Sequence, residues 1–172
     1  DRLGMLVIDE AFDCWREGKT PYDYHVAFPD WWQRDLDSML FRDRNHPSVI
    51  MWSIGNEVRE RNGRSQGVEI AQALADRIRE VDPTRPVTAA INGSGDTWPW
   101  EQTDAVFAAL DIGGYNYQEK QYRSDHERHP ERIMYGSEST AEEALEHWTA
   151  VEELPYVIGD FVWTSLDYLG EA

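Results

Sequence analysis

Short apolar runs alternate with amphipathic segments along the whole chain. The apolar runs are rich in β-branched, aromatic and other large hydrophobic residues, which is typical of strands. They cover residues 5–9, 49–54, 86–91, 111–115, 132–136 and 156–163. Between them apolar residues recur at helical spacing, most clearly over 67–81, where Ile70, Ala71, Leu74, Ala75 and Ile78 share one face. The pattern also predicts helices over 30–44, 104–110, 118–129 and 140–153.

The alternation of strands and helices predicts an α/β fold with a parallel sheet. The run 49–54 is apolar at nearly every position, which suits a strand buried on both faces. A doubly wound sheet and a (β/α)8 TIM barrel both fit this alternation. No Gly-rich phosphate loop follows any strand, so a nucleotide-binding Rossmann fold lacks support. Polar and acidic residues gather just after the strand ends, which in a barrel is the face that carries active sites.

Composition narrows the classes of function. The 172 residues include 33 acidic and 16 basic side chains, for a net charge of −17. Such a field repels nucleic acid and anionic membrane surfaces, so we expect neither as a partner. Cys14 is the single cysteine, so the chain cannot form an internal disulfide. The cellular compartment therefore stays open: the protein could be cytoplasmic, periplasmic or secreted. We expect a bacterial source. The 8 Trp and 8 Tyr residues fit a carbohydrate site, because aromatic rings can stack on sugars.

Two glutamates each come shortly after a glycine at the end of a predicted strand. Glu57 closes the sequence WSIGNE, and Glu138 closes the sequence MYGSE. A carboxylate at the carboxyl end of a barrel strand is placed for catalysis. Each also has a structural alternative, since Glu57 could pair with Arg59 or Arg61 and Glu138 could cap the following helix. The sequence TAEE, which begins at Thr140, has the pattern of a capping box for that helix.

As a pair, the two glutamates suit glycoside hydrolysis, which needs a carboxyl group on each side of the scissile bond. One group must stay protonated at neutral pH, so its pKa must be raised by burial or by a negative neighbour. The other must be ionised to attack the anomeric carbon. We therefore predict that Glu57 and Glu138 face each other at about 5 Å, the separation typical of retaining enzymes.

Residues 42–57, with the sequence RDRNHPSVIMWSIGNE, resemble the family 2 glycoside hydrolases, which include β-galactosidases, β-glucuronidases and β-mannosidases. Three further segments match in order: 3–13 is similar to the family's third barrel strand, 134–139 to its nucleophile strand, and 161–171 to its eighth strand. The resemblance implies one domain over 1–172 that forms an incomplete TIM barrel, about the last six strand–helix units, without the family's flanking β-sandwich domains. The runs at Met5 and Tyr156 should then be the outer strands.

The resemblance also implies roles for individual residues. Glu57 matches the general acid/base, and Glu138 matches the nucleophile. Asn56 matches the residue that contacts the substrate's 2-hydroxyl, and Tyr117 matches a tyrosine whose hydroxyl orients the nucleophile. Trp163 matches an aromatic wall of the sugar subsite.

An acidic cluster follows the first predicted strand. Asp9, Glu10 and Asp13 match the family's cluster after its third strand, and we expect Asp9 and Glu10 to bind substrate. Some β-galactosidases of the family bind magnesium there with a carboxylate and a histidine. Asp13 could match that carboxylate, but Trp15 takes the histidine's place. We therefore expect no metal site, and the reaction needs no organic cofactor.

The resemblance implies retaining hydrolysis of terminal β-linked sugars by double displacement. The expected partner is a carbohydrate substrate, and a homo-oligomer is compatible with the sequence. Residues 167–171, with the sequence DYLGE, favour a β-galactosidase, and β-glucuronidase and β-mannosidase are the alternatives. A function of another class stays open, because the strands are too few to close a (β/α)8 barrel. The chain could be an inactive fragment or a sugar-binding remnant.

Overall fold

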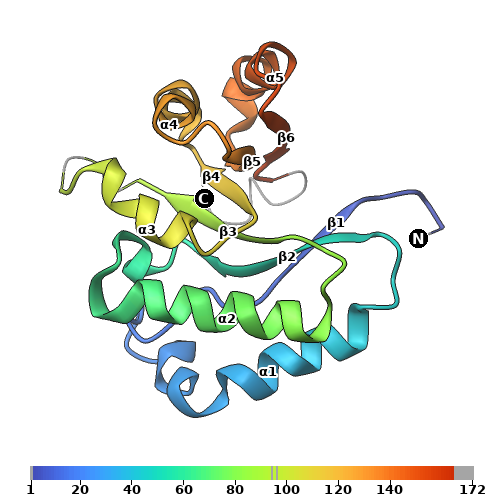
Figure 1. Cartoon of the computed structure of the whole chain (residues 1–172), viewed down its shortest axis with the longest axis vertical. Coiled ribbons are helices and arrows are strands. Elements are labelled where there is room, and N and C mark those ends of the chain that lie inside the picture. Colours follow the sequence, from blue (N-terminus) through green and yellow to red (C-terminus); the bar gives the residue numbers. More distant parts are fainter. Residues whose placement is uncertain (1, 94, 96, 165–172) are drawn as a thin grey trace. The chain divides into compact units, whose positions relative to one another are not determined.

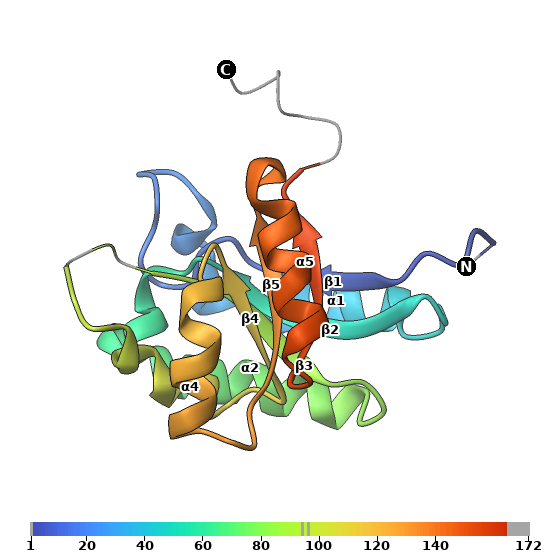
Figure 2. The ribbon, with the colours of Figure 1, turned by 90° about the horizontal axis from the view of Figure 1, so that it is seen from above.

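The computed structural model describes residues 2–93, 95 and 97–164 (Figures 1 and 2). The segment 167–171, used above to favour a β-galactosidase, lies outside the described residues. The strands are β1 (Val7–Glu10), β2 (Val49–Asn56), β3 (Val87–Asn92), β4 (Ile112–Asn116), β5 (Ile133–Ser139) and β6 (Val157–Val162). The α-helices are α1 (Phe28–Asp43), α2 (Gly67–Val81), α3 (Asp104–Phe107), α4 (Tyr122–Arg128) and α5 (Ala144–Glu153).

The strands form one sheet in the order β1-β2-β3-β4-β5-β6. The pairs β1/β2, β3/β4, β4/β5 and β5/β6 are all parallel. Strands that follow one another in both sequence and space, with helical connections between them, are the arrangement of a (β/α)8 barrel. The prediction of an incomplete barrel is therefore confirmed, and β1 and β6 are the outer strands of the described sheet.

Contacts between residues divide the chain into two compact units. Unit 1 comprises Asp1–Ala89 and Ser94–Asp111, and unit 2 comprises Ala90–Gly93 and Ile112–Ala172. The strand β3 contributes residues to both units. Glu57 belongs to unit 1 and Glu138 to unit 2.

The core of unit 1 is built on the apolar face that the sequence predicts for α2. This helix packs against α1 and against β2 (Figure 1). Its face is buried, with exposed fractions of 7% or less at Ile70, Ala71, Leu74, Ala75 and Ile78. The packing fixes the position of β2, the strand that leads into Glu57.

In unit 2, α5 packs against β5 and β6 (Figure 2). A buried polar group holds α4 to the strands. The Asp125 carboxylate is fully buried, and it accepts hydrogen bonds from the Tyr115 hydroxyl at 2.7 Å and from Arg132 at 3.0 Å. A buried carboxylate needs such partners, because an unpaired charge in the interior is costly.

Several local predictions differ from the structure, mostly in the bounds of elements. The strand β1 starts at Val7 rather than at residue 5, because its pairing with β2 begins there. The helix α1 begins at Phe28 rather than at Asp30, since Pro29 suits a first helical turn, where its missing N–H would have no partner. The capping box is wrong: the Thr140 hydroxyl donates to the Glu143 carboxylate at 2.8 Å and caps no backbone N–H.

Candidate active site

The end of β2 presents Asn56 and then Glu57. The Asn56 backbone N–H donates to the Phe12 carbonyl at 3.0 Å, and its own carbonyl accepts from the Lys19 ammonium at 3.1 Å. Its side-chain amide donates to Asp13 Oδ1 at 3.1 Å. The loop after β1 therefore orients the Asn56 side chain directly and also holds the backbone that leads to Glu57.

Glu57 and Tyr117 share an unusual backbone conformation. Their φ angles are 47° and 56°, in the left-handed region that favours glycine. Each residue directly follows an asparagine that ends a strand, Asn56 in β2 and Asn116 in β4. A residue held in this region costs roughly 1–2 kcal/mol and is found preferentially at functional sites. The strain marks both positions as candidates, and the sequence carries no signal of it.

Arg61 supplies a positive charge that acts on Glu57. Burial lowers the pKa of Arg61, and the Glu57 carboxylate opposes that shift. The Arg61 guanidinium donates to the Val58 carbonyl at 2.9 Å and lies 5.3 Å from the ring centre of Trp98, in the loop after β3. Arg61 is thus a positive neighbour of Glu57. The alternative that Glu57 pairs with Arg59 or Arg61 stays a prediction, as does its catalytic role.

In unit 2, Glu138 lies in β5 and accepts a hydrogen bond from the Tyr117 hydroxyl at 2.7 Å. The Tyr117 backbone N–H also donates to the Glu138 carbonyl, at 2.8 Å. The predicted hydrogen bond between these side chains is therefore confirmed. Thr140 precedes the turn that opens the next helix, so the alternative role of Glu138 as its cap is wrong.

Asp9 and Glu10 do not line the same surface. Glu10 Oε2 accepts from the Ser53 hydroxyl at 2.6 Å, across the β1/β2 pair. Successive side chains of a strand point to opposite faces. Asp9 instead contacts Asp43 at the end of α1, and burial together with Asp43 raises the pKa of Asp9 to about 6. The expectation that Asp9 binds substrate beside Glu10 loses support.

The candidate for magnesium, Asp13, is engaged by protein groups. Lys19 lies 2.6 Å from it in an ion pair, and Asn56 donates to the same oxygen. Trp15 is fully buried and donates its indole N–H to the Ile54 carbonyl at 2.9 Å, which makes it structural. Within 2–93, 95 and 97–164, no group of three His, Cys, Asp or Glu side chains is placed to hold a metal ion. The expectation of no metal stays a prediction.

Trp163 directly follows β6 and is 51% exposed. Its backbone N–H donates to the Ser139 carbonyl at 2.8 Å, which ties it to the strand of Glu138. Its role as the wall of a sugar subsite stays a prediction. So does the separation of about 5 Å between Glu57 and Glu138, because these residues belong to different units.

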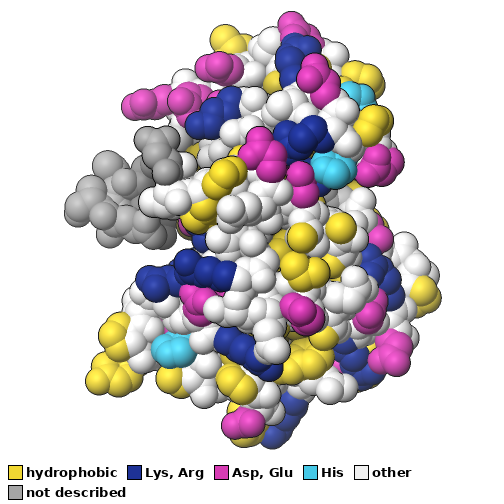
Figure 3. All heavy atoms as spheres, turned by 60° about the vertical axis from the view of Figure 1, so that its left-hand side comes forward, with side chains coloured by type: hydrophobic (Ala, Val, Ile, Leu, Met, Phe, Trp, Pro, Cys, Tyr) yellow, Lys and Arg dark blue, Asp and Glu magenta, His cyan; other side chains and the backbone are white. Residues whose placement is uncertain are grey.

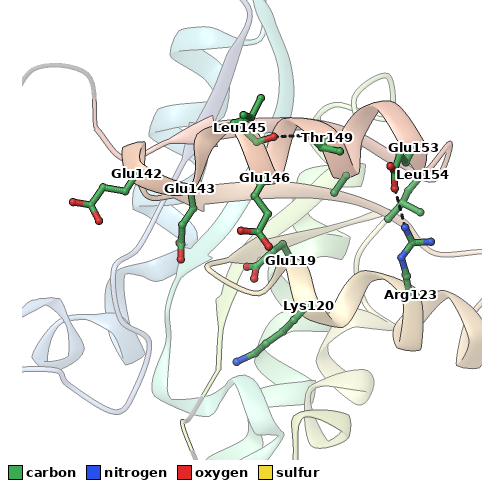
Figure 4. A pocket seen from close by; sticks show the side chains of 11 residues that line it. Glu119, Lys120, Arg123, Glu142, Glu143, Leu145, Glu146, Thr149, Glu153 and Leu154 are labelled. Atoms are coloured by element: carbon green, nitrogen blue, oxygen red, sulfur yellow. Dashed lines mark hydrogen bonds and ion pairs between the residues drawn. The ribbon is translucent and has the colours of Figure 1, made fainter.

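A groove of about 640 Å³ lies on the outside of unit 2, between α5 and the segment around the start of α4 (Figure 4). Its lining includes Glu119, Lys120, Arg123, Glu142, Glu146 and Glu153 but neither Tyr117 nor Glu138. We therefore do not assign it to the sugar. On the face that Figure 3 shows, acidic side chains are interspersed with Lys and Arg, as on an ordinary solvated surface.

The family model of the glycosyl hydrolases family 2 TIM barrel domain matches residues 1–171. The chain belongs to this family. A solved family 2 member from Bacteroides cellulosilyticus is 52% identical to this barrel, with a TM-score of 0.88 over 95% of this chain and 20% of that one. A β-galactosidase of Bacteroides ovatus is 29% identical, over 99% of this chain and 28% of that protein. A solved β-glucuronidase from Bacteroides uniformis is 27% identical, with a TM-score of 0.72 over 95% of this chain and 24% of that one.

This family 2 barrel chain thus spans less than a third of the length of each of these relatives. Both β-galactosidases and β-glucuronidases are represented among them. In the part of the chain that the structure describes, no helix combines the length and apolar character required to cross a membrane.

The structure also brings Ser139, His147 and Asp160 together next to Glu138, a group that the sequence did not single out.

Proposed function

We propose that this chain carries the catalytic residues of a retaining β-glycoside hydrolase, with terminal β-galactosides as the favoured substrates. The observation that carries the proposal is the 2.7 Å hydrogen bond from Tyr117 to Glu138 at the strand ends of a family 2 barrel. A hydrogen bond donated to a carboxylate favours its ionised form. Glu138 is thereby held as the charged, oriented group that a nucleophile must be.

In the first step, Glu138 attacks the anomeric carbon and forms an ester bond to it. The glycosidic C–O bond breaks, and its electron pair stays on the leaving oxygen. Glu57 donates a proton to that oxygen as general acid. Asn56, oriented by Asp13, would contact the 2-hydroxyl of the sugar, and Trp163 would stack on the ring.

In the second step, Glu57 acts as general base and takes a proton from water. The water oxygen attacks the anomeric carbon, and the ester bond to Glu138 breaks. Two inversions give net retention, and Glu138 returns to its carboxylate form. Glu57 regains from water the proton that it gave to the leaving oxygen, so the cycle needs neither an organic cofactor nor a redox partner.

β-Glucuronides are the second candidate substrates, because a β-glucuronidase of similar fold and identity stands beside the β-galactosidase among the relatives. β-Mannosides are a third possibility within the same mechanism. Because this chain spans only 28% of the β-galactosidase and 20% of the Bacteroides cellulosilyticus structure, the activity is proposed for the full-length protein.

The test uses the full-length protein with aryl β-galactosides and aryl β-glucuronides that have good leaving groups. Glu138→Gln should abolish both turnover and the burst of released phenol. Glu57→Gln should keep the burst and lose turnover, since an activated leaving group needs little protonation whereas attack by water needs the base. If both variants lose the burst equally, the assignment of the two roles is wrong. If the unmodified protein hydrolyses neither class, nor the β-mannoside, the proposal fails.

A further inference from the structure

His147 is buried in unit 2 between two carboxylates. It belongs to α5, and its side chain is only 1% exposed. Its Nδ1 lies 3.4 Å from Asp160 Oδ1, and its Nε2 lies 3.5 Å from Glu119 Oε2. Among the described residues, neither ring nitrogen makes a hydrogen bond, and neither does Asp160 Oδ1, so the two carboxylates are close neighbours of the ring. The double displacement does not use this side chain, so its burial needs another reason.

Each ring nitrogen of His147 faces a carboxylate oxygen, and a carboxylate oxygen can only accept a hydrogen bond when it is ionised. Tyr122 of α4 faces the same carboxylates, and burial, followed by the negative charges of Asp160 and Glu119, raises its pKa. Tyr122 therefore stays neutral and adds no charge to this group.

The partners of His147 belong to segments that bear candidate site residues. Glu119 comes shortly after Tyr117 and also lines the groove beside α5 (Figure 4). Asp160 lies in β6, and its Oδ2 accepts a hydrogen bond from the Ser139 hydroxyl at 2.6 Å. Ser139 directly follows Glu138 in β5. One buried side chain thus connects the segments after β4, in β5 and in β6.

Glu138 and Ser139 are neighbours in β5 with different partners: Glu138 meets Tyr117, and Ser139 meets Asp160. The pairing of β5 with β6 is irregular between Gly136 and Ser139, and both of these residues approach Asp160. Gly136 makes room for this arrangement, because a Cβ at that position would lie 2.0 Å from Asp160 Oδ1. Groups packed this closely in a protein interior leave little room for one of them to move without the others.

We propose that His147 is a positioning residue that, packed between Glu119 and Asp160, holds Glu138 and Tyr117 in their productive arrangement. The inference rests on the proposed function, because it concerns the nucleophile of that reaction. Displacement of a reacting group by even an ångström slows its reaction strongly, whereas binding of the sugar depends on many other contacts. Loss of His147 should therefore reduce the rate of covalent reaction at Glu138 more than it reduces binding.

The test is covalent trapping of Glu138 in the full-length protein by an activated 2-deoxy-2-fluoro β-galactoside, or by the corresponding glucuronide if only glucuronides are hydrolysed. His147→Gln suits the test because both N–H groups of an amide sit on one nitrogen, so they do not reproduce two ring nitrogens that face two carboxylates. We expect its maximal trapping rate to fall about tenfold, with the binding constant of the reagent changed less than about threefold. The matched control is His129→Gln, at the end of α4, where the side chain is 33% exposed and should leave both constants unchanged.

Asp160→Asn is the second variant, and it keeps an acceptor for Ser139 if His147→Gln does not fold. It should lower the trapping rate in the same sense, and the effects of the two substitutions should not add, because they break the same contact. All variants are compared well below their unfolding temperatures. Trapping at the unmodified rate, or a loss confined to the binding constant or to the folded fraction, would overturn the positioning role. If the unmodified protein is not trapped at Glu138, the proposed function fails and this inference fails with it.

Discussion

The hydrogen bond between Tyr117 and Glu138 makes the substitution Tyr117→Phe a direct test of the nucleophile. The change removes one hydroxyl and keeps the ring, so packing around it is preserved. The donor–acceptor distance is 2.7 Å, within the range of charge-assisted hydrogen bonds. Such a bond contributes about 1.5–3 kcal/mol. At about 1.4 kcal/mol per factor of ten, its full loss in the transition state would slow the first step by roughly 10- to 150-fold.

The structure also sets limits on this effect. The second contact between the residues, from the Tyr117 N–H to the Glu138 carbonyl, involves only backbone atoms and survives the substitution. The strand end should therefore keep its shape, and the loss should appear in the rate of glycosylation rather than in the unfolding temperature.

Pre-steady-state kinetics of the full-length protein with an aryl β-glycoside would measure the first step directly. Tyr22→Phe is the matched control, because that side chain is 92% exposed. A burst rate for Tyr117→Phe within about twofold of the unmodified value would refute the reasoning, since a bond of this strength cannot be lost at so small a cost. An equal loss in the Tyr22 variant would show that the assay reports something other than this contact.

Two further predictions concern stability. Asp9→Asn should raise the free energy of unfolding at pH 7, because burial and Asp43 raise the pKa of Asp9 from 3.8 to about 6, and ionising it destabilises the folded state as the pH rises through that value. The pKa shift corresponds to a gain in unfolding free energy of at most about 3 kcal/mol, and partial exposure of Asp9 reduces the expected gain to about 1 kcal/mol. Denaturation in urea should show this gain at pH 7 and little of it at pH 4. An equal gain at both pH values would contradict the assignment. Gly67→Ala should lower stability by about 2 kcal/mol or more, since its Cβ would lie 2.1 Å from the Glu60 carbonyl oxygen. Gly159→Ala, with no atom within 4 Å of the added Cβ, should change the unfolding temperature far less, and similar shifts would count against the clash.

Local pattern was sufficient to predict the order of the elements and the places where chemistry gathers. The apolar period of α2 identified its buried face, because a helix that covers a sheet must repeat its contacts every 3.6 residues. The strand-ending sequences placed Glu57 directly after β2, where the structure has it. They placed Glu138 just after a strand ending at Gly136, whereas β5 continues through Ser139 and includes Glu138. These features depend on neighbours in the chain, so the sequence contains them directly.

Tertiary structure decided which side chains meet. Asp9 and Glu10 looked alike in sequence, but the β1/β2 register sends one to Asp43 and the other to Ser53. The β4/β5 register shifts next to Asn116, which pairs with Glu138.

The burial of His147 also had no signal in the sequence, because its two carboxylates come from the segment after β4 and from β6. Contacts of this kind depend on strand register and helix packing. A period along the chain reports only which face of an element is apolar, and so it cannot specify the partner that faces it.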